Sequence, residues 1–416
     1  MDNQPSFVPI NPSIVLRNLC RLPQLIFEVT DACNLNCTYC TYSNLYTGHD
    51  SRTDKYLPFD TARAVIDYLV DLWQTHNSPQ FLRRFSIGFY GGEPLLNIDF
   101  VKEVIDYIEH QKIINRTIFY TATTNGVLLD RYIDYLATKN FSLLISLDGN
   151  EHAQGFRVDK NGNNSFSNVY NNIKMVQERY PAFFKERVSF NAVLHSKNDV
   201  GSIFEFFLSN FSKTPTISSL SGNRVNRQRE NLFNDICNNY TQSFYKSNNI
   251  EIIENLSFMQ SPKLLGFYRQ YEQKSGNVFD DYRDLLFDRQ ETGIFPTGTC
   301  LPFAKKMFVT VNGKILPCER ISHVYTLGKV IGGKVELDFN YIADSHNRHI
   351  FKFINFCQKC IHKKSCPRCI YQYSNLKGPD NICNYYSDKS GGFDLSPLIN
   401  NPNLLSRIMY ELKVVK

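Results

Sequence analysis

Short apolar runs alternate with longer segments of helical periodicity through the first half of the chain. Strand-like runs are expected at 24–29, 85–90, 117–124, 141–149 and 187–194, and helical periods at 59–73, 98–111, 129–139, 166–180 and 199–210. A strand, helix, strand order repeated this often is typical of a parallel sheet wrapped by crossover helices. We therefore predict an α/β fold with a partial (β/α)6 TIM-like barrel at 23–222, although a doubly wound sheet satisfies the same pattern.

The sequence pattern changes twice after residue 222. Polar stretches with a few helical periods predict a helical bridge at 223–295. From 296 to 390, cysteines, glycines and short strand-like pieces replace long periods, as in a small domain whose core is partly metal. A short segment at 1–22 comes before the first strand, and a closing amphipathic helix is expected at 391–416.

Composition excludes several classes of protein. The 416 residues are 42% hydrophobic and carry a formal net charge of only +6, which is spread along the chain. A large core is therefore expected, and no Arg-rich helix indicates a nucleic-acid partner. Because the chain has neither a run of eighteen apolar residues nor the layout of a secretory signal, we predict a cytoplasmic protein that does not enter a membrane.

The chain contains twelve cysteines, and their number and spacing are the most informative feature of its composition. In a reducing compartment, tight cysteine spacings indicate metal ligation rather than disulfides. Cys20 and Cys237 stand alone and are expected to be small buried hydrophobes. The other ten fall into two groups: Cys33, Cys37 and Cys40 near the start, and Cys300, Cys318, Cys357, Cys360, Cys366, Cys369 and Cys383 near the end.

The first group has the spacing Cys33-x3-Cys37-x2-Cys40 and follows directly after the first predicted strand. Three thiolates on one short loop can hold three irons of a 4Fe–4S cluster and leave the fourth iron open. A structural zinc site would require four closed ligands. The position after a barrel strand places the loop at the carboxyl edge of the sheet, where such folds keep their chemistry.

These residues carry a family resemblance. The sequence TDACNLNCTYC resembles the signature loop of the radical S-adenosylmethionine (radical SAM) superfamily, and Gly91, Gly92 and Glu93 resemble its GGEP motif. The resemblance implies that SAM chelates the open iron and is cleaved reductively to a 5′-deoxyadenosyl radical, which removes a hydrogen atom from the substrate. The GGEP residues would meet the amino group of SAM, although an ordinary strand-to-helix turn has the same composition.

The resemblance also implies further SAM contacts near the ends of the next strands. Tyr39 would lie against adenine, while Ser146 and Arg157 would bind the ribose and the carboxylate, for which an arginine fork is suited. Each of these positions, taken singly, also fits a turn or a solvated loop. The remaining candidates of this kind are Thr124, Asn125 and Asp148.

The second group of cysteines resembles the SPASM extension, which implies two auxiliary 4Fe–4S clusters; alone, its CxxC pairs also fit a zinc ribbon. Two departures from the family stand out: two residues rather than three separate Cys366 from Cys369, and Lys306 replaces a cysteine ligand of sulfatase maturases. The first auxiliary cluster is therefore one ligand short. The implied ligands are Cys300, Cys318 and Cys369 for the first cluster, and Cys357, Cys360, Cys366 and Cys383 for the second.

Glu319 follows Cys318, where sulfatase maturases carry their aspartate base. It is the candidate catalytic base that accepts a proton from a substrate radical. Two other interpretations stay open: a carboxylate that caps the open auxiliary iron, and an ordinary surface glutamate.

The resemblance implies a peptide maturase that forms a thioether or carbon–carbon crosslink in a ribosomally made precursor peptide. Its partners would be the precursor peptide and an electron donor such as flavodoxin or ferredoxin. The segment before the first strand is too short for a leader-recognition domain, so the leader would bind the barrel, the 211–295 bridge or a separate leader-binding protein. The alternatives are a sulfatase-maturase-like enzyme that forms formylglycine, a peptide epimerase with a thiol donor such as Cys237, and a non-catalytic metal-binding scaffold.

Overall fold

The computed structural model describes residues 9–76, 83–111, 113, 116–257, 261–262, 297–360, 366, 368–372, 403, 406 and 407. The chain divides into two compact units. The first comprises Cys20–Ile253 and Lys306–Leu337, and the second comprises Met1–Leu19, Glu254–Lys305 and Asp338–Lys416. The predicted helix at 391–416 lies outside the described residues except at Asn403, Ser406 and Arg407, and Cys383 lies outside them too.

The first unit is built on one sheet with the strand order β10-β9-β8-β7-β1-β2-β3-β4-β5-β6. Its parallel strands stand in chain order: β1 Gln24–Thr30, β2 Arg83–Gly91, β3 Arg116–Thr124, β4 Ser142–Ser146, β5 Val188–Leu194 and β6 Thr216–Ser219. A doubly wound sheet reverses its order at a switch point, whereas right-handed crossovers in unbroken order keep every helix on one face. The predicted α/β partial barrel is confirmed.

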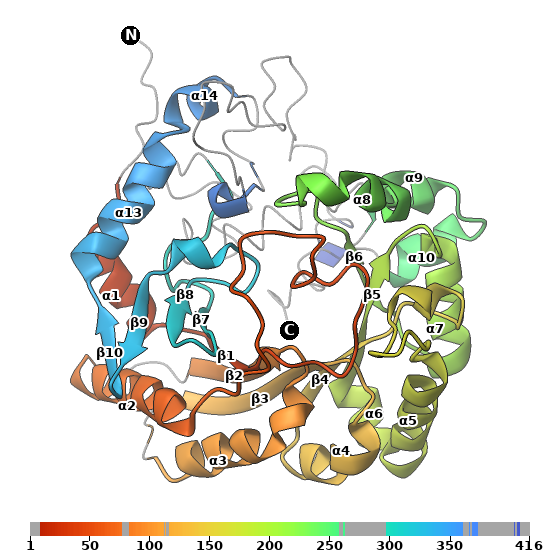
Figure 1. Cartoon of the computed structure of the whole chain (residues 1–416), viewed down its shortest axis with the longest axis horizontal. Helices are drawn as coiled ribbons and strands as arrows, with labels where there is room; N and C mark the ends of the chain where they lie inside the picture. Colours follow the sequence, from red (N-terminus) through yellow and green to blue (C-terminus); the bar gives the residue numbers. More distant parts are fainter. Residues whose placement is uncertain are drawn as a thin grey trace. The chain divides into compact units, whose positions relative to one another are not determined.

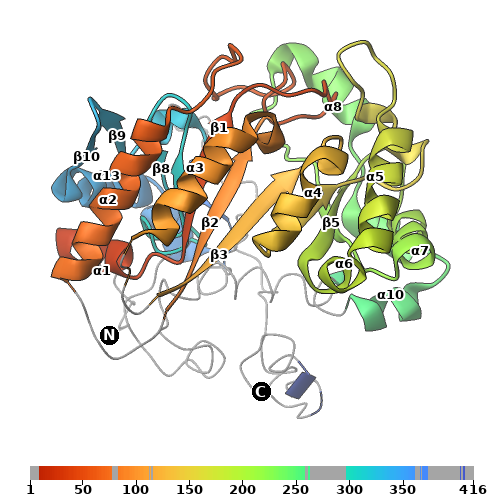
Figure 2. The ribbon, with the colours of Figure 1, turned by 90° about the horizontal axis from the view of Figure 1, so that it is seen from below.

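Helices cover the outer face of this sheet (Figures 1 and 2). They are α2 Phe59–Thr75, α3 Ile98–Glu109, α4 Leu129–Thr138, α5 Phe166–Arg179, α6 Pro181–Arg187 and α7 Val200–Phe211. In α2 the apolar residues Val65, Ile66, Leu69 and Trp73 recur at helical spacing and are all buried, so this face packs on the sheet. The carboxyl ends of β1–β5 are thereby left to loops.

Four further strands extend the sheet beyond β1. Strand β7 Met307–Val309 pairs in parallel with β1, and the antiparallel strands β8 Lys314–Leu316, β9 Gly328–Ile331 and β10 Lys334–Leu337 follow. The sequence indicated strand-like pieces here but assigned them to the small domain that starts at 296. All three residues of β7 are buried against the barrel, so this region lies in the same unit as the first cysteine loop.

The bridge region contains the short helices α8 Glu230–Ile236, α9 Tyr240–Tyr245 and α10 Ile250–Leu256. The second unit contains α13 Phe339–Phe351, α14 Ile354–Lys359 and all of α1 Pro12–Cys20 except its last residue. Asp338 caps α13 by accepting a hydrogen bond from Tyr341 N (3.0 Å). No helix in the described ranges is long and apolar enough to cross a bilayer.

Candidate active site at the carboxyl edge of the barrel

The three-cysteine loop leaves the end of β1 with its thiols close together. Burial raises the pKa of Cys33 to about 11 and that of Cys37 to about 12, and Cys40 adds to both shifts. Leu35 N donates a hydrogen bond to Cys33 Sγ (3.4 Å). Grouped, partly buried thiolates are costly unless a cation takes up their charge, which the irons of a cluster would do.

The donor set of this loop consists of three thiols, the ligand type that iron–sulfur clusters use. In the part of the chain that the structure describes, no three His, Cys, Asp or Glu side chains are grouped to hold a single metal ion. Thiolates at the corners of a 4Fe–4S cube stand farther apart than ligands around one zinc. Cys33, Cys37 and Cys40 are chemically suited to supply three of the four thiolates that a 4Fe–4S cluster takes up.

The two glycines that end β2 let this strand lie directly against the cysteine loop. Gly92 N donates to Thr30 O (2.8 Å), and Glu93 N donates to Ala32 O (2.9 Å). A Cβ on Gly92 would stand 1.9 Å from Ala32 O, and Gly91 has a φ of +132°. The expected close approach at this strand end is present, and its partner is the backbone of the cysteine loop.

Glu93 connects this strand end to the next. Its Oε1 accepts from Leu95 N (3.1 Å) and Thr124 Oγ1 (2.8 Å), and its Oε2 accepts from Asn125 N (2.7 Å). Asn125 in turn donates to Asn34 Oδ1 in the cysteine loop (2.7 Å). Burial raises the pKa of Glu93 to about 7 against these hydrogen bonds. The candidates Gly91, Gly92, Glu93, Thr124 and Asn125 thus lie in one connected group.

Asp148, just beyond the end of β4, organises a second group. Its carboxylate accepts from Tyr39 OH and from Val193 N (2.9 Å), and it lies 3.3 Å from His195 Nε2 and 3.1 Å from Arg157 Nε. Burial alone would raise its pKa, but Arg157, His195 and Tyr39 hold the pKa of Asp148 below its usual range. The carboxylate is therefore ionised at neutral pH.

Tyr39 is fixed by this network. Its ring stacks on His195 (centroids 5.6 Å apart) and lies under the Arg157 guanidinium (5.3 Å). Sequence reasoning missed His195, which is fully buried directly after β5. A polar residue at the end of a predicted barrel strand was the available signal. Ser146 is the half-buried last residue of β4, two residues before Asp148.

Replacing Asp148 by alanine is expected to destabilise the protein by about 3–5 kcal/mol, because Arg157 would remain buried without its counter-ion. The matched control is Asp134→Ala, which removes an ion pair with Arg179 on the exposed surface and should have little effect. Anaerobic thermal unfolding measures both variants. Equal midpoints for the two would contradict a structural role of the Asp148 network.

The Glu319 side chain is largely buried, at 12% exposure. Lys306 Nζ lies 3.0 and 3.1 Å from its two carboxylate oxygens, and Cys318 Sγ lies 3.6 Å from Oε2. Burial acts to raise its pKa, but Lys306 and the neighbouring Arg320 hold the pKa of Glu319 below its usual range. Burial, then Glu319 and Cys40, raise the pKa of Tyr90, so this tyrosine lies near both groups.

Most of the second cysteine group lies in the second unit. Cys357 is in α14, and Cys360 directly follows that helix and donates its N–H to Cys357 O (3.2 Å). Cys366 is 8% exposed. The members that the structure places in this unit are Cys300, Cys357, Cys360, Cys366 and Cys369; Cys318 lies in the first unit and Cys383 outside the described residues.

The prediction that Cys20 and Cys237 are buried hydrophobes is wrong for Cys237, which is exposed, while Cys20 is half-buried. Cys237 directly follows α8, and its backbone is extended rather than helical. It forms an isolated β-bridge with His195.

Glu28 of β1 is 2% exposed and accepts a hydrogen bond from Val311 N (2.9 Å). Burial raises its pKa from the ordinary 4.5 to about 7. Because the folded-state pKa is the higher one, its ionisation costs stability as the pH rises from about 4.5 to about 7, by at most about 3 kcal/mol. Glu28→Gln keeps the acceptor and should flatten this decline between pH 5 and pH 8.

Anaerobic thermal unfolding at the two pH values checks this expectation, with Glu178→Gln at an exposed position as the control. An unchanged difference between pH 5 and pH 8 in Glu28→Gln would rule out Glu28 as its source.

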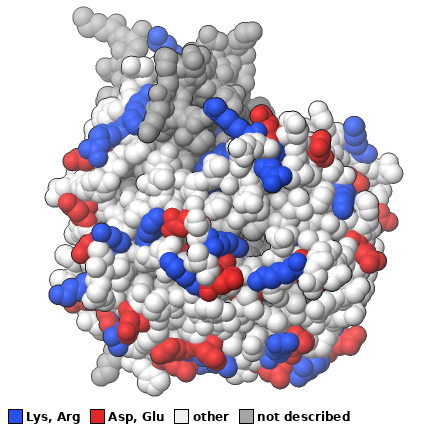
Figure 3. All heavy atoms as spheres, viewed as in Figure 1, with Lys and Arg blue, Asp and Glu red and all other residues white. Residues whose placement is uncertain are grey.

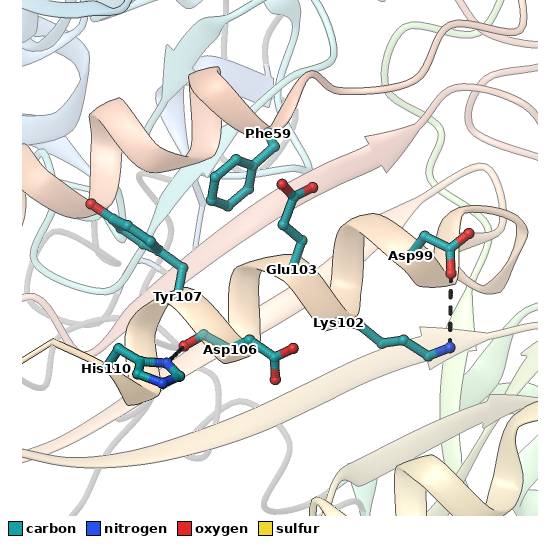
Figure 4. A pocket seen from close by; sticks show the side chains of 7 residues that line it. All are labelled: Phe59, Asp99, Lys102, Glu103, Asp106, Tyr107 and His110. Carbon is teal, nitrogen blue, oxygen red and sulfur yellow. Dashed lines mark hydrogen bonds and ion pairs between the residues drawn. The ribbon is translucent and has the colours of Figure 1, made fainter.

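A surface hollow of about 630 Å³ lies away from these groups, between α2 and α3 (Figure 4). In this hollow Lys102 forms an ion pair with Asp99 (3.8 Å). Phe59, Tyr107 and His110, which directly follows α3, also line the hollow. It holds no cysteine. Basic and acidic side chains are interspersed on the face drawn in Figure 3.

The family model of the Radical SAM superfamily matches residues 27–206, which span β1 to α7 and include the cysteine loop and both polar groups. Residues 27–206 form a radical SAM domain. The chain is also similar to a cysteine-type anaerobic sulfatase-maturating enzyme of Clostridium novyi, with 26% identity over 45% of this chain and 48% of that protein. It is 24% identical to the radical SAM cyclopropyl synthase TigE of Paramaledivibacter caminithermalis, over 62% of this chain and 48% of that one.

The matched regions thus span about half of the length of these two relatives. Among solved structures, native anSMEcpe with bound AdoMet and Cp18Cys peptide has a TM-score of 0.56 and 18% identity, over 85% of this chain and 91% of that one. This likeness supports the fold of the radical SAM domain described above.

Proposed function

We propose that this chain is a radical SAM enzyme that modifies a ribosomally made precursor peptide. SAM bound at the open iron would supply, after one-electron reduction, the 5′-deoxyadenosyl radical that removes a hydrogen atom from the peptide. The product is a thioether or a carbon–carbon crosslink. The observation that carries the proposal is the three-cysteine loop, bound by its backbone to the GGEP strand end within a radical SAM domain.

The residues of the chain would then hold the cluster and orient SAM. Cys33, Cys37 and Cys40 hold the cluster. A carboxylate has about four acceptor sites, so Glu93 retains capacity for the SAM ammonium beyond its three hydrogen bonds. Asp148 and His195 fix the Tyr39 ring for contact with adenine. Ser146 and Arg157, with Asp148 beside them, would border the ribose and carboxylate of SAM.

Bond formation requires that the substrate radical lose one electron, while the attacking thiol or carbon loses one proton. We assign the proton to Glu319, which is largely buried, lies near Tyr90 and is held by Lys306. The electron would pass to an auxiliary 4Fe–4S cluster held by the second cysteine group. The departing hydrogen atom is carried off in 5′-deoxyadenosine.

The test is incubation of the anaerobically reconstituted protein with SAM, a reductant and the product of a small open reading frame beside its gene. We expect 5′-deoxyadenosine and a peptide that has lost two hydrogens by mass spectrometry. Iron content should be about twelve per chain for three clusters. One or two zincs per chain without SAM cleavage would instead identify a metal-binding scaffold.

Formation of formylglycine is the second candidate, since the chain is similar to a protein named as a sulfatase-maturating enzyme. The engagement of Glu319 by Lys306, where those enzymes carry a cluster cysteine, speaks against it. In that reaction a cysteine substrate would exchange its sulfur for an oxygen from water, and a cysteine and a serine substrate alike would give a trappable aldehyde. An epimerase would leave the peptide mass unchanged in ordinary water.

The proposal includes partners and location. A cytoplasmic flavodoxin or ferredoxin would reduce the clusters, and a separate protein would bind the leader of the precursor. Addition of each candidate partner to the assay should raise the yield of modified peptide, while SAM cleavage without peptide should depend on the electron donor alone.

A further inference from the structure

The segment between the cysteine loop and α2 is anchored on both sides of Arg52. On one side, Asp50 pairs with Lys314 at the start of β8 (2.7 Å). On the other, Asp31 accepts a hydrogen bond from Thr53 N (3.1 Å). The chain is therefore anchored two residues before and one residue after Arg52.

The Arg52 guanidinium lies over the Tyr42 ring, 4.0 Å from its centroid. Its Nε and Nη2 atoms are buried and have no hydrogen-bond partner, and the same holds for Tyr42 OH. In the described part of the chain, no carboxylate forms an ion pair with Arg52. Buried donors of a charged group are rarely left unbonded, so this guanidinium points to a ligand.

The unbonded atoms have a definite geometry. Nε and Nη2 form one edge of the planar guanidinium, and their two N–H groups point the same way. This edge matches the two oxygens of a carboxylate in a bidentate pair. Glu28, the nearby carboxyl group of β1, uses its Oε2 to accept from Val311 N and does not occupy this edge.

The surroundings place this edge beside the reaction site. The charge of Arg52 lowers the pKa of Cys33 and that of Tyr90. Cys40 and Glu319 raise the pKa of Tyr90. The neighbours of Arg52 thus lie in or directly after β1, in β2 and in the region after β8. The candidate SAM contacts come from Tyr39 in the cysteine loop and from the ends of β2, β3 and β4 with the loop beyond β4.

We propose that Arg52, stacked on Tyr42, binds a carboxylate of the peptide substrate next to the reacting residue. The proposal rests on the proposed function and adds the class of substrate: a peptide with an Asp, a Glu or a terminal carboxylate close to the modified position. Arg52 is then a specificity-determining residue of this chain.

The test uses an mRNA-displayed library of random peptides, selected anaerobically on the reconstituted full-length protein with SAM. Wild-type protein should enrich Asp and Glu about tenfold at one position. Arg52→Gln should return them to the input frequency, and Arg52→Lys, which keeps the charge without the planar edge, should give an intermediate value. Arg84→Gln is the matched control, because Arg84 also stacks on an aromatic ring (Phe119, 4.3 Å) but is exposed.

Three results would overturn the inference: no acidic enrichment by wild-type protein, equal enrichment by Arg52→Gln, or a tenfold loss of labelled SAM binding in Arg52→Gln by equilibrium dialysis. The last would assign the edge to the cofactor carboxylate. Cleavage of SAM by the same wild-type preparation tests the proposed function separately, since acidic peptides would still be selected if that cleavage were absent.

Discussion

Replacing Cys33, Cys37 and Cys40 together by alanine is expected to abolish 5′-deoxyadenosine formation and to remove about four irons per chain. The reason is that the three thiols are grouped on one loop, and each partly buried thiolate is tolerable only with a cluster to take up its charge. Anaerobic iron analysis and chromatography of the SAM products measure both effects.

Cys20→Ala is the control for this experiment, because Cys20 is a half-buried thiol outside the loop. It should keep wild-type iron content and SAM cleavage. If the triple variant still formed 5′-deoxyadenosine at the rate of Cys20→Ala, the radical SAM assignment of the loop would fail.

Much of the fold could be predicted from the local spacing of apolar residues. The helix at 59–73 and the strand at 24–29 were predicted within two residues of α2 and β1, because their apolar spacing reports which face is buried. Strand β6 was missed because Thr216–Ser219 is short, polar and partly exposed. Its place is set by parallel pairing with β5, which local sequence does not report.

Long-range pairing also explains what the sequence left open in the site. The cysteine loop can be recognised from the spacing of three cysteines within eight residues. The Tyr39–Asp148 hydrogen bond, in contrast, joins residues more than a hundred positions apart. The same holds for β7, whose pairing with β1 brings Glu319 into the unit of the cysteine loop. Only the parallel pairing of the strands brings the ends of β1, β4 and β5 to the same edge of the sheet.

Gly92→Ala is expected to destabilise the protein by about 3 kcal/mol and to lower its iron content. The new Cβ would stand 1.9 Å from Ala32 O and 2.4 Å from the carbon of that carbonyl group. Since backbone cannot yield as a side chain end does, the loop must move and the Glu93 N–Ala32 O hydrogen bond must lengthen. The displaced loop would no longer present its thiols together.

The control is Gly222→Ala, at a position where the nearest atom to a new Cβ is Phe233 Cζ at 3.9 Å and the backbone needs no positive φ. It should stay within about 0.5 kcal/mol of wild type. Anaerobic thermal unfolding and iron analysis compare the two variants. Iron content and midpoint equal in both would mean that the cysteine loop does not depend on its contact with the GGEP strand end.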